Sequence, residues 1–422
     1  MTYQIVEIRN YGPKKNRPRR KILLKGSLPV YYPNLYISLE QSGRALNTQQ
    51  KYLEHIGLFE GFLECESVDL VGRLEERPKS QYLTDNEISR FVADAALSKS
   101  VLDKKYSGVR LLPAAYTTVG RVHAQQRLEA VRDYLKFLYD KLGDDATRDA
   151  AVDDVVRRFN RKIRSARPAL KKRKNDEIKG LTHQERKRLL EVMHPESSEN
   201  PFANESLKLR NYIILLLGLE LGLRRSEMLL IKLGDIHWHN RQLSIVDSED
   251  ESIDSRASAP QFKTHERMLP MGDDLTWALQ TYVDTYRVLR RAREHPFLLV
   301  SHRRNEGSQL SIKALDGVLP RVGKVVPELE QVHLHVLRHD SVYTLLESMR
   351  EELEKLTPED RTTQVQKVLT YAFGWSPESH MPGLYGAKFW KEEADKAMKK
   401  RSERFTVISE SVESEICKVP TE

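Results

Sequence analysis

The 422-residue chain contains only two cysteines, Cys65 and Cys417. Two thiols are too few for the disulfide framework of a small secreted domain, and their scarcity fits a reducing compartment such as the cytosol. The chain also lacks a long apolar run, because its longest, near residues 213–217, is far shorter than the roughly 20 residues that a membrane-spanning helix needs. The first residues show no signal-peptide pattern. We therefore expect a cytoplasmic protein with no membrane partner.

Basic residues exceed acidic ones, and the excess is concentrated in two segments. The chain has 69 Lys and Arg against 61 Asp and Glu, which gives a formal net charge of +8 and a pI near 9.1. This balance favours polyanionic partners, because Lys and Arg release counterions from nucleic-acid phosphates. Residues 1–30 form the first basic segment. It is either a solvated basic tail or an arm that contacts DNA.

The second basic segment covers residues 157–178. Ten Lys or Arg and no acidic residue occur between positions 157 and 174. Repulsion among like charges keeps such a segment extended unless a polyanion neutralises it. We interpret it as a linker that crosses a DNA backbone, with an ordinary charged linker as the alternative. The candidate DNA-binding residues are Arg157, Arg158, Arg161, Lys162, Arg164, Lys171, Lys172, Arg173 and Lys174.

Apolar residues that recur at three- and four-residue steps predict helices on both sides of this linker. Thr182 and Glu185 have the spacing of a capping box, which predicts that a helix begins at His183. Turn residues between short apolar runs predict a β-hairpin over residues 235–246. The predicted helices cover residues 47–63, 122–142, 183–193 and 205–221, a short stretch after Arg225, and residues from Leu275 onward.

Five side chains with complementary chemistry follow in order through the second half of the chain. They are Arg224, Lys263, His335, Arg338 and Tyr385. His335 and Arg338 are three residues apart, so a helix places both on one face, within reach of one phosphate. An arginine binds phosphate through a two-pronged fork, and a histidine titrates near neutral pH. A tyrosine hydroxyl can attack a phosphodiester when cationic side chains clamp the developing charge.

These residues lie in motifs that resemble the tyrosine recombinase (phage integrase) family. The motifs are Gly222-Leu223-Arg224 followed by Ser226-Glu227, Gln261-Phe262-Lys263-Thr264, His335-Val336-Leu337-Arg338-His339, Gly374-Trp375 and Tyr385. The resemblance implies a nucleophile at Tyr385, a general acid at Lys263, and supporting roles for Glu227 and His339. The catalytic residues that it implies are Arg224, Lys263, His335, Arg338, Trp375 and Tyr385.

Two features depart from the family pattern. Tyr385 follows Trp375 by ten residues, one more than usual, and we expect a loop that contains Pro382 and Gly383 to absorb the extra residue. Tyr371 precedes Trp375 on a predicted helix and is the poorer candidate for the nucleophile. An acidic insert over residues 247–254 should point away from DNA, because its charge has the same sign as the phosphates.

The resemblance implies a mainly α fold with a small β-hairpin or sheet (α+β), arranged as a two-domain clamp around DNA. A helical core-binding domain precedes an integrase-type catalytic domain in this plan. The expected boundaries are 1–30 for a basic arm, 31–156 for the core-binding domain, 157–178 for the linker, 179–390 for the catalytic domain and 391–422 for a C-terminal helix and tail.

The implied activity is site-specific DNA recombination, in which double-stranded DNA is cut and rejoined through a 3′-phosphotyrosine without a metal or other cofactor. A mobile element that undergoes integration or transposition is the expected setting. The expected state is a tetrameric synapse on DNA within the nucleoid, open to accessory recombination proteins. The alternatives are a type IB topoisomerase or telomere-resolvase-like enzyme, a catalytically inactive integrase-like DNA-binding protein, and an RNA-binding protein, which only the basic charge supports.

Overall fold

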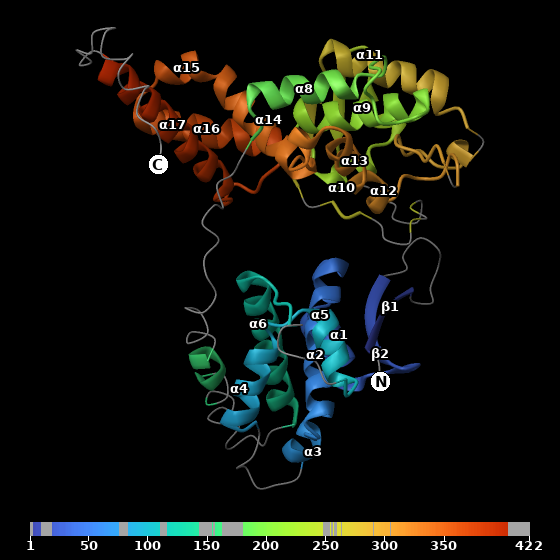
Figure 1. Ribbon diagram of the computed structural model, residues 1–422, viewed down its shortest axis with the longest axis vertical. Coiled ribbons are helices and arrows are strands. Elements are labelled where there is room, and N and C mark those ends of the chain that lie inside the picture. Colours follow the sequence, from blue (N-terminus) through green and yellow to red (C-terminus); the bar gives the residue numbers. More distant parts are fainter. Residues whose placement is uncertain are drawn as a thin grey trace, which may run out of the picture. The chain divides into compact units, whose positions relative to one another are not determined.

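The computed structural model describes residues 3–9, 19–75, 83–109, 116–142, 154, 157–162, 180–247, 254, 256, 260–262, 264–289, 291–303 and 305–403. The chain divides into two compact units, Met1–Asp176 and Glu177–Glu422, and each is described by itself (Figure 1). Both units are mainly helical and carry a small antiparallel sheet, which confirms the predicted fold class. None of the helices in the described ranges combines the length and apolar character that crossing a membrane requires.

The first unit begins with a three-stranded antiparallel sheet. β1 (Tyr3–Arg9) pairs with β2 (Arg19–Lys25), which pairs with β3 (Leu28–Pro29). Leu23 of β2 is 1% exposed and packs on α2 (Leu46–Cys65), where Gly57 offers no side chain to obstruct it. The prediction of an arm over residues 1–30 is therefore wrong for these strands, because apolar residues between the basic ones anchor them to a core.

Helices form the rest of the first unit. The helices predicted over 47–63 and 122–142 are confirmed as α2 and α6 (Arg121–Leu142), which lie side by side and supply most of the core (Figure 1). Tyr134 of α6 donates a hydrogen bond to Glu60 of α2 at 2.9 Å. The remaining helices are α1 (Tyr31–Glu40), α3 (Leu70–Glu75), α4 (Asp85–Asp94) and α5 (Lys99–Tyr106).

The first residues of the predicted linker also belong to this unit. Residues 157–162 are helical, and Phe159 is fully buried in the same core as α2 and α6. Arg158 donates a hydrogen bond to the carbonyl oxygen of Leu83 at 2.9 Å. The linker therefore does not begin at residue 157, because the buried side chain of Phe159 holds the helical residues 157–162 against the core of the first unit. Residues 163–179, with Arg164, Lys171, Lys172, Arg173 and Lys174, lie outside the described residues.

The second unit is built around α9 (Glu205–Leu219), whose side chains are buried on almost every side. The predicted capping box precedes α8 (His183–Met193), since Thr182 Oγ1 accepts a hydrogen bond from the Glu185 amide at 3.2 Å. The other helices in this part are α10 (Arg225–Leu230), α11 (Asp273–Thr281), α12 (Ile312–Asp316) and α13 (Val318–Val325).

A three-stranded sheet lies beside these helices. β4 (Ile236–His237) and β5 (Gln242–Ile245) form the predicted hairpin, and Arg241 in its turn has a positive φ of 50°. β5 also pairs with β6 (Arg267–Pro270), in which residues alternate between buried and exposed. This alternation places Arg267 on the buried face together with Leu269, which brings a charged residue into the interior.

Four helices complete the unit and form a second core: α14 (Leu334–Ser348), α15 (Arg350–Glu354), α16 (Pro358–Phe373) and α17 (Met381–Glu403). Figure 1 shows α15, α16 and α17 gathered at one end of the unit. The expectation of a loop that contains Pro382 and Gly383 is wrong, because α17 begins at Met381 and includes both residues as well as Tyr385. Pro382 does not prevent this, since the first turn of a helix needs no amide donors.

Candidate active site

Arg224 and Arg338 converge on one backbone carbonyl. Arg338, on α14, donates hydrogen bonds to the carbonyl oxygens of Gly222 at 2.6 Å and Phe373 at 2.8 Å, and Arg224 donates to that of Phe373 at 3.2 Å. Gly222 follows α9 with a φ of +58°, and a Cβ there would lie only 2.3 Å from the Phe373 ring. Glycine is therefore required for the end of α9 to approach the end of α16 and bring both guanidinium groups together.

Glu227 balances the charge of these arginines from inside the protein. Its carboxylate is 3.0 Å from Arg267, 3.7 Å from Arg224 and 3.8 Å from Arg338, and it accepts a hydrogen bond from the Thr264 hydroxyl at 2.6 Å. Burial opposes ionisation, but the charge of Arg267 and the hydrogen bonds outweigh it and lower the pKa of Glu227. Glu227 therefore lies next to three arginines, and its supporting role in the site stays a prediction.

Arg267 was not among the predicted site residues. Its side chain is 1% exposed, and it donates hydrogen bonds to Glu227 and to the carbonyl oxygens of Ala372 and His265. It thereby connects β6, α10 and the end of α16. The sequence did contain a signal for its burial. Arg267 and Leu269 are two residues apart in a short strand, and residues two apart in a strand face the same side.

The predicted general acid, Lys263, lies outside the described residues, but the residues after it approach the site. Thr264 reaches Glu227, and the His265 amide donates to the carbonyl oxygen of Gly374 at 3.2 Å. A Cβ on Gly374 would be 2.6 Å from Arg267, so this approach also depends on glycine. The role of Lys263 stays a prediction.

His335 and Arg338 lie on the first turns of α14, as their spacing predicted. The His335 side chain is exposed, whereas Arg338 is 3% exposed. Although the side chain is exposed, the atoms packed around its ring withdraw it partly from water, and this desolvation together with the positive charge of Arg338 lowers the pKa of His335, so the imidazole is neutral at pH 7. Burial and the charge of Arg224 lower the pKa of Arg338, while Glu227 opposes both. An arginine nevertheless stays protonated in a protein, so the pair remains cationic.

Tyr385 lies in the first turns of α17, with its ring stacked on Trp375. The two ring centroids are 5.6 Å apart with an interplanar angle of 18°, and Trp375 also contacts the guanidinium of Arg338 at 5.4 Å. Tyr385 is only 4% exposed, and its hydroxyl forms a hydrogen bond with Nδ1 of His339. Burial raises the pKa of Tyr385 to about 12, although Arg338 and Arg224 act in the opposite direction.

The structure therefore brings together the predicted catalytic and supporting residues of the described ranges: Arg224, Glu227, His335, Arg338, His339, Trp375 and Tyr385. The candidate DNA-binding residues Arg157, Arg158, Arg161 and Lys162 belong to the first unit and are not among them. The weaker candidate Tyr371 lies apart from them, because it is exposed on α16 and donates its hydroxyl to the Met268 carbonyl. Contact between His339 and Tyr385 was not predicted, since it depends on α17 packing against α14.

The last residue of the acidic insert, Asp254, points into the protein, whereas the sequence predicted only that the insert points away from DNA. Asp254 is buried and forms an ion pair with Arg256 at 2.7 Å. Arg256 also donates to the carbonyl oxygens of Leu229 and Leu310, which fixes this point to the helical core. Asp254 thus points inward because a buried arginine neutralises it, while residues 248–253 lie outside the described residues.

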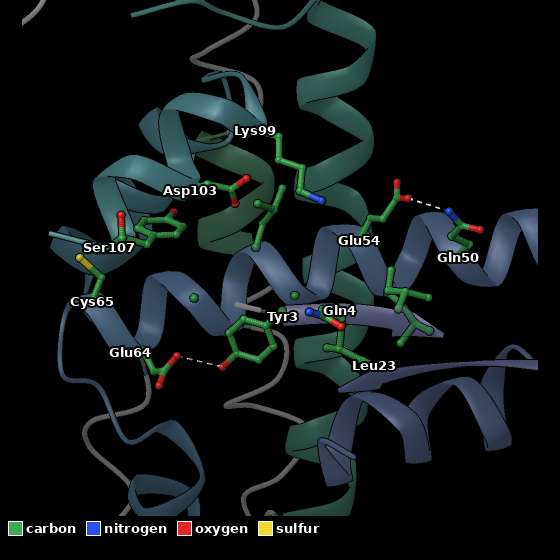
Figure 2. A pocket seen from close by; sticks show the side chains of 16 residues that line it. Tyr3, Gln4, Leu23, Gln50, Glu54, Glu64, Cys65, Lys99, Asp103 and Ser107 are labelled. Carbon is green, nitrogen blue, oxygen red and sulfur yellow. Dashed lines mark hydrogen bonds between the residues drawn. The ribbon is translucent and has the colours of Figure 1, made fainter. Parts of the chain in front are cut away.

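A separate cavity of about 700 Å³ lies in the first unit between β1, α2 and α5 (Figure 2). Its acidic lining is largely engaged within the protein. Tyr3 donates to Glu64 and Gln50 donates to Glu54, as the dashed lines in Figure 2 mark. None of the predicted catalytic residues within the described ranges lies in this unit. Across the described ranges, no group of three or more His, Cys, Asp or Glu side chains could hold a metal ion.

Residues 179–352 match the model of the phage integrase family. No curated protein matches the chain.

Among solved structures, the Tn1549 transposon integrase in complex with circular intermediate DNA is 13% identical and covers 84% of this chain and 93% of that chain, with a TM-score of 0.50. Its complex with transposon right end DNA is 13% identical and covers 87% and 99%, with the same TM-score of 0.50. The XerH site-specific recombinase bound to palindromic difH substrate is 13% identical and covers 84% and 80%, with a TM-score of 0.49. At this identity the similarity to the integrase concerns the fold.

Proposed function

We propose that the chain is a site-specific recombinase of the tyrosine class that cuts and rejoins DNA through a 3′-phosphotyrosine on Tyr385, because residues 179–352 match the model of the phage integrase family. One observation carries the proposal. Tyr385 is buried and stacked on Trp375, which in turn contacts the guanidinium group of Arg338. A buried phenol beside two arginines has the composition that phosphodiester cleavage without a metal requires.

The arginines act as the electrostatic clamp. Arg224 and Arg338 both donate to the Phe373 carbonyl, so their guanidinium groups lie close together, and we propose that one phosphate binds beside both of them. Glu227 holds them there before DNA arrives, and such preorganised charges need no rearrangement as the transition state forms. The exposed, neutral His335 at the start of α14 donates a further hydrogen bond to a phosphate oxygen.

The proposed reaction has two transfers. The Tyr385 oxygen attacks phosphorus, the bond to the 5′ oxygen breaks, and that oxygen takes a proton from Lys263. The 5′ hydroxyl of another strand then attacks the phosphotyrosine and releases Tyr385. Each transfer exchanges one phosphate ester for another, so the bond energy is conserved and no external energy source is needed.

We place this reaction in a mobile element, with four protomers on two DNA sites in the nucleoid. Strand exchange between two duplexes needs four cleavages, which a tetramer supplies with one tyrosine each. The transposon setting is supported by the fold that the chain shares with the Tn1549 integrase, whose complexes contain transposon DNA. The basic stretch before residue 179 and the helical first unit are proposed to complete a clamp around DNA.

Covalent trapping tests the proposal directly. The full chain is mixed with fragmented host DNA that carries random nicks, so that short cut strands diffuse away and the covalent intermediate persists. The expected product is a protein–DNA adduct on a peptide that contains Tyr385, recovered at a recurrent DNA sequence. Tyr385→Phe should abolish the adduct, whereas Tyr371→Phe, which removes an exposed hydroxyl on α16, should leave it unchanged.

The other outcomes identify the alternatives. DNA binding without any adduct would contradict catalysis and favour an inactive DNA-binding protein on the same fold. Adducts spread over DNA without a recurrent sequence, together with relaxation of supercoiled plasmid, would instead favour a topoisomerase-like enzyme. An adduct on a different tyrosine would contradict the assignment of Tyr385 but not that of the family.

A further inference from the structure

The histidine that contacts the proposed nucleophile is His339, not His335. Nδ1 of His339 forms a hydrogen bond with the Tyr385 hydroxyl, and the two ring centroids are 5.6 Å apart. His335 contacts His339, with ring centroids 4.2 Å apart. We propose that His339 is a catalytic residue that accepts the proton of the Tyr385 hydroxyl when DNA cleavage begins. This inference rests on the proposed function, because it assigns the proton of that nucleophile.

The contact depends on three elements that are held independently of it. His335 and His339 are one turn apart on α14, so both side chains lie on the same face of the helix. α17 packs against α14 and α16, which brings Tyr385 to this face. Trp375, just beyond the end of α16, stacks on the tyrosine ring and fixes its orientation. The hydroxyl is therefore directed at His339 by packing and not by the hydrogen bond alone.

The protonation state that this role requires follows from the hydrogen bond. For Nδ1 to accept the hydroxyl proton, the imidazole must be neutral with its own proton on Nε2. A proton acceptor is needed because burial raises the pKa of Tyr385 to about 12. At pH 7, such a hydroxyl is ionised in only about one molecule in 10⁵.

The proton and the electrons can be followed through the step. The O–H bond of Tyr385 breaks, its proton moves to Nδ1 of His339, and the oxygen uses the freed electron pair to attack phosphorus. The bond from phosphorus to the 5′ oxygen breaks, and the leaving oxygen takes a proton from Lys263. In the return transfer the histidinium gives its proton back to the departing tyrosine oxygen, so His339 ends neutral. His335, which is exposed beside the arginines, contacts the phosphate instead.

His339→Asn separates proton acceptance from hydrogen bonding. An asparagine oxygen can occupy the place of Nδ1 and accept a hydrogen bond, but it does not take a proton. On a nicked DNA substrate containing the site found by trapping, we expect adduct formation by His339→Asn to slow by about 10²- to 10⁴-fold, the usual contribution of a general base. DNA affinity and the unfolding temperature should not change. His333→Asn, an exposed histidine at the N-terminus of α14, is the matched control and should keep the wild-type rate.

A more acidic nucleophile supplies the decisive measurement. Replacing the Tyr385 side chain with a fluorinated tyrosine lowers the pKa of its hydroxyl, so an external proton acceptor becomes less important. We expect this replacement to accelerate the His339→Asn protein by about tenfold or more and to leave the otherwise wild-type protein within about threefold. A residue that only positions the tyrosine would not respond to the acidity of its hydroxyl. His339→Gln, measured in the same way, covers the case in which the asparagine variant does not fold.

Each outcome decides one claim. A His339→Asn rate within about twofold of wild type, or a slow rate that the fluorinated tyrosine does not improve, overturns the proton-acceptor role. In both cases an adduct on Tyr385 in the wild-type protein still supports the proposed function. If the wild-type protein forms no adduct on Tyr385, the proposed function fails and this inference fails with it.

Discussion

At the scale of single residues, the site depends on charges that are compensated inside the protein. Glu227 and Arg267 are both 1% exposed in their side chains and pair at 3.0 Å, in contact with the two arginines of the proposed clamp. A buried pair of this kind contributes little net stability, but removing one partner leaves an uncompensated charge. Arg267 should therefore matter for both the fold and the geometry of the site, although it does not touch DNA in the proposed mechanism.

Arg267→Met should lower the free energy of unfolding of the second unit by about 3–5 kcal/mol, because it leaves the Glu227 carboxylate buried without its main partner. Chemical denaturation of the full chain measures this change. The double variant Arg267→Met with Glu227→Gln should recover part of the loss, since it removes the stranded charge. Arg241→Met, in the turn between β4 and β5, is the control, because it breaks an exposed pair with Asp273 of α11 and should cost no more than about 1 kcal/mol. Equal effects of the two single variants would contradict the role of Arg267.

Most residues of the site could be predicted from sequence because their spacing along the chain is distinctive. Arg224, Arg338, Trp375 and Tyr385 each lie in a short motif, and the structure brings them into contact. Arg267 could not be predicted as readily, because a lone arginine near other basic residues usually lies on the surface.

The contact between His339 and Tyr385 could not be predicted from the sequence either. His339 and Tyr385 are separated by 46 positions, and their contact depends on how α17 packs against α14.

At the scale of elements, the structure changes the interpretation of the first thirty residues. Seven basic residues within positions 14–25 predicted an arm, yet the last four of them lie in strand β2 together with the apolar residues Ile22–Leu24. One of them, Leu23, fills a space above Gly57 on α2, and its amide donates to the side chain of Asn34 at 2.7 Å. The sheet is therefore a structural part of the first unit.

Leu23→Ala should destabilise the first unit by about 2–5 kcal/mol, as expected for a buried leucine whose removal leaves a cavity. Limited proteolysis of the full chain at increasing temperature should then show earlier cleavage within residues 19–142, with the cleavage of residues 180–403 unchanged. Leu28→Ala, on the same sheet but 74% exposed, provides the control and should behave like the wild type. If Leu23→Ala also behaves like the wild type, the sheet is not anchored by this residue.

Regular elements were predicted best where one periodic signal dominates. The apolar spacing of α2 and α6 and the capping box before α8 located these helices to within one or two residues. The start of α17 could not be predicted, because Pro382, Gly383 and Gly386 are typical of loops and their cost is covered here by packing of Tyr385 and Phe389 into the core. Tertiary contacts therefore determined the element that carries the proposed nucleophile.

At the scale of the whole molecule, the two units differ in what they supply. The second unit carries the proposed chemistry, while the first carries no residue of the proposed cleavage reaction. Between their described parts lies the strongly basic sequence that includes Lys171, Lys172, Arg173 and Lys174. Arg158, at the start of this basic sequence, donates a hydrogen bond to the carbonyl oxygen of Leu83. The contribution of the basic sequence to DNA binding should therefore come mainly from its later residues.

Replacing Lys171, Lys172, Arg173 and Lys174 together with Gln should weaken the dependence of DNA binding on salt. Each phosphate contact that is lost should reduce the slope of log affinity against log salt concentration by about 0.9, so four contacts correspond to about 3.6. Titration of a labelled duplex at several salt concentrations measures the slope. A control that exchanges Lys and Arg at the same four positions keeps every charge and should keep the wild-type slope, because counterion release depends on charge and not on side-chain shape. If the Gln variant keeps that slope too, the segment is a charged linker that does not contact the DNA backbone, and the affinity of the protein must come from its two folded units.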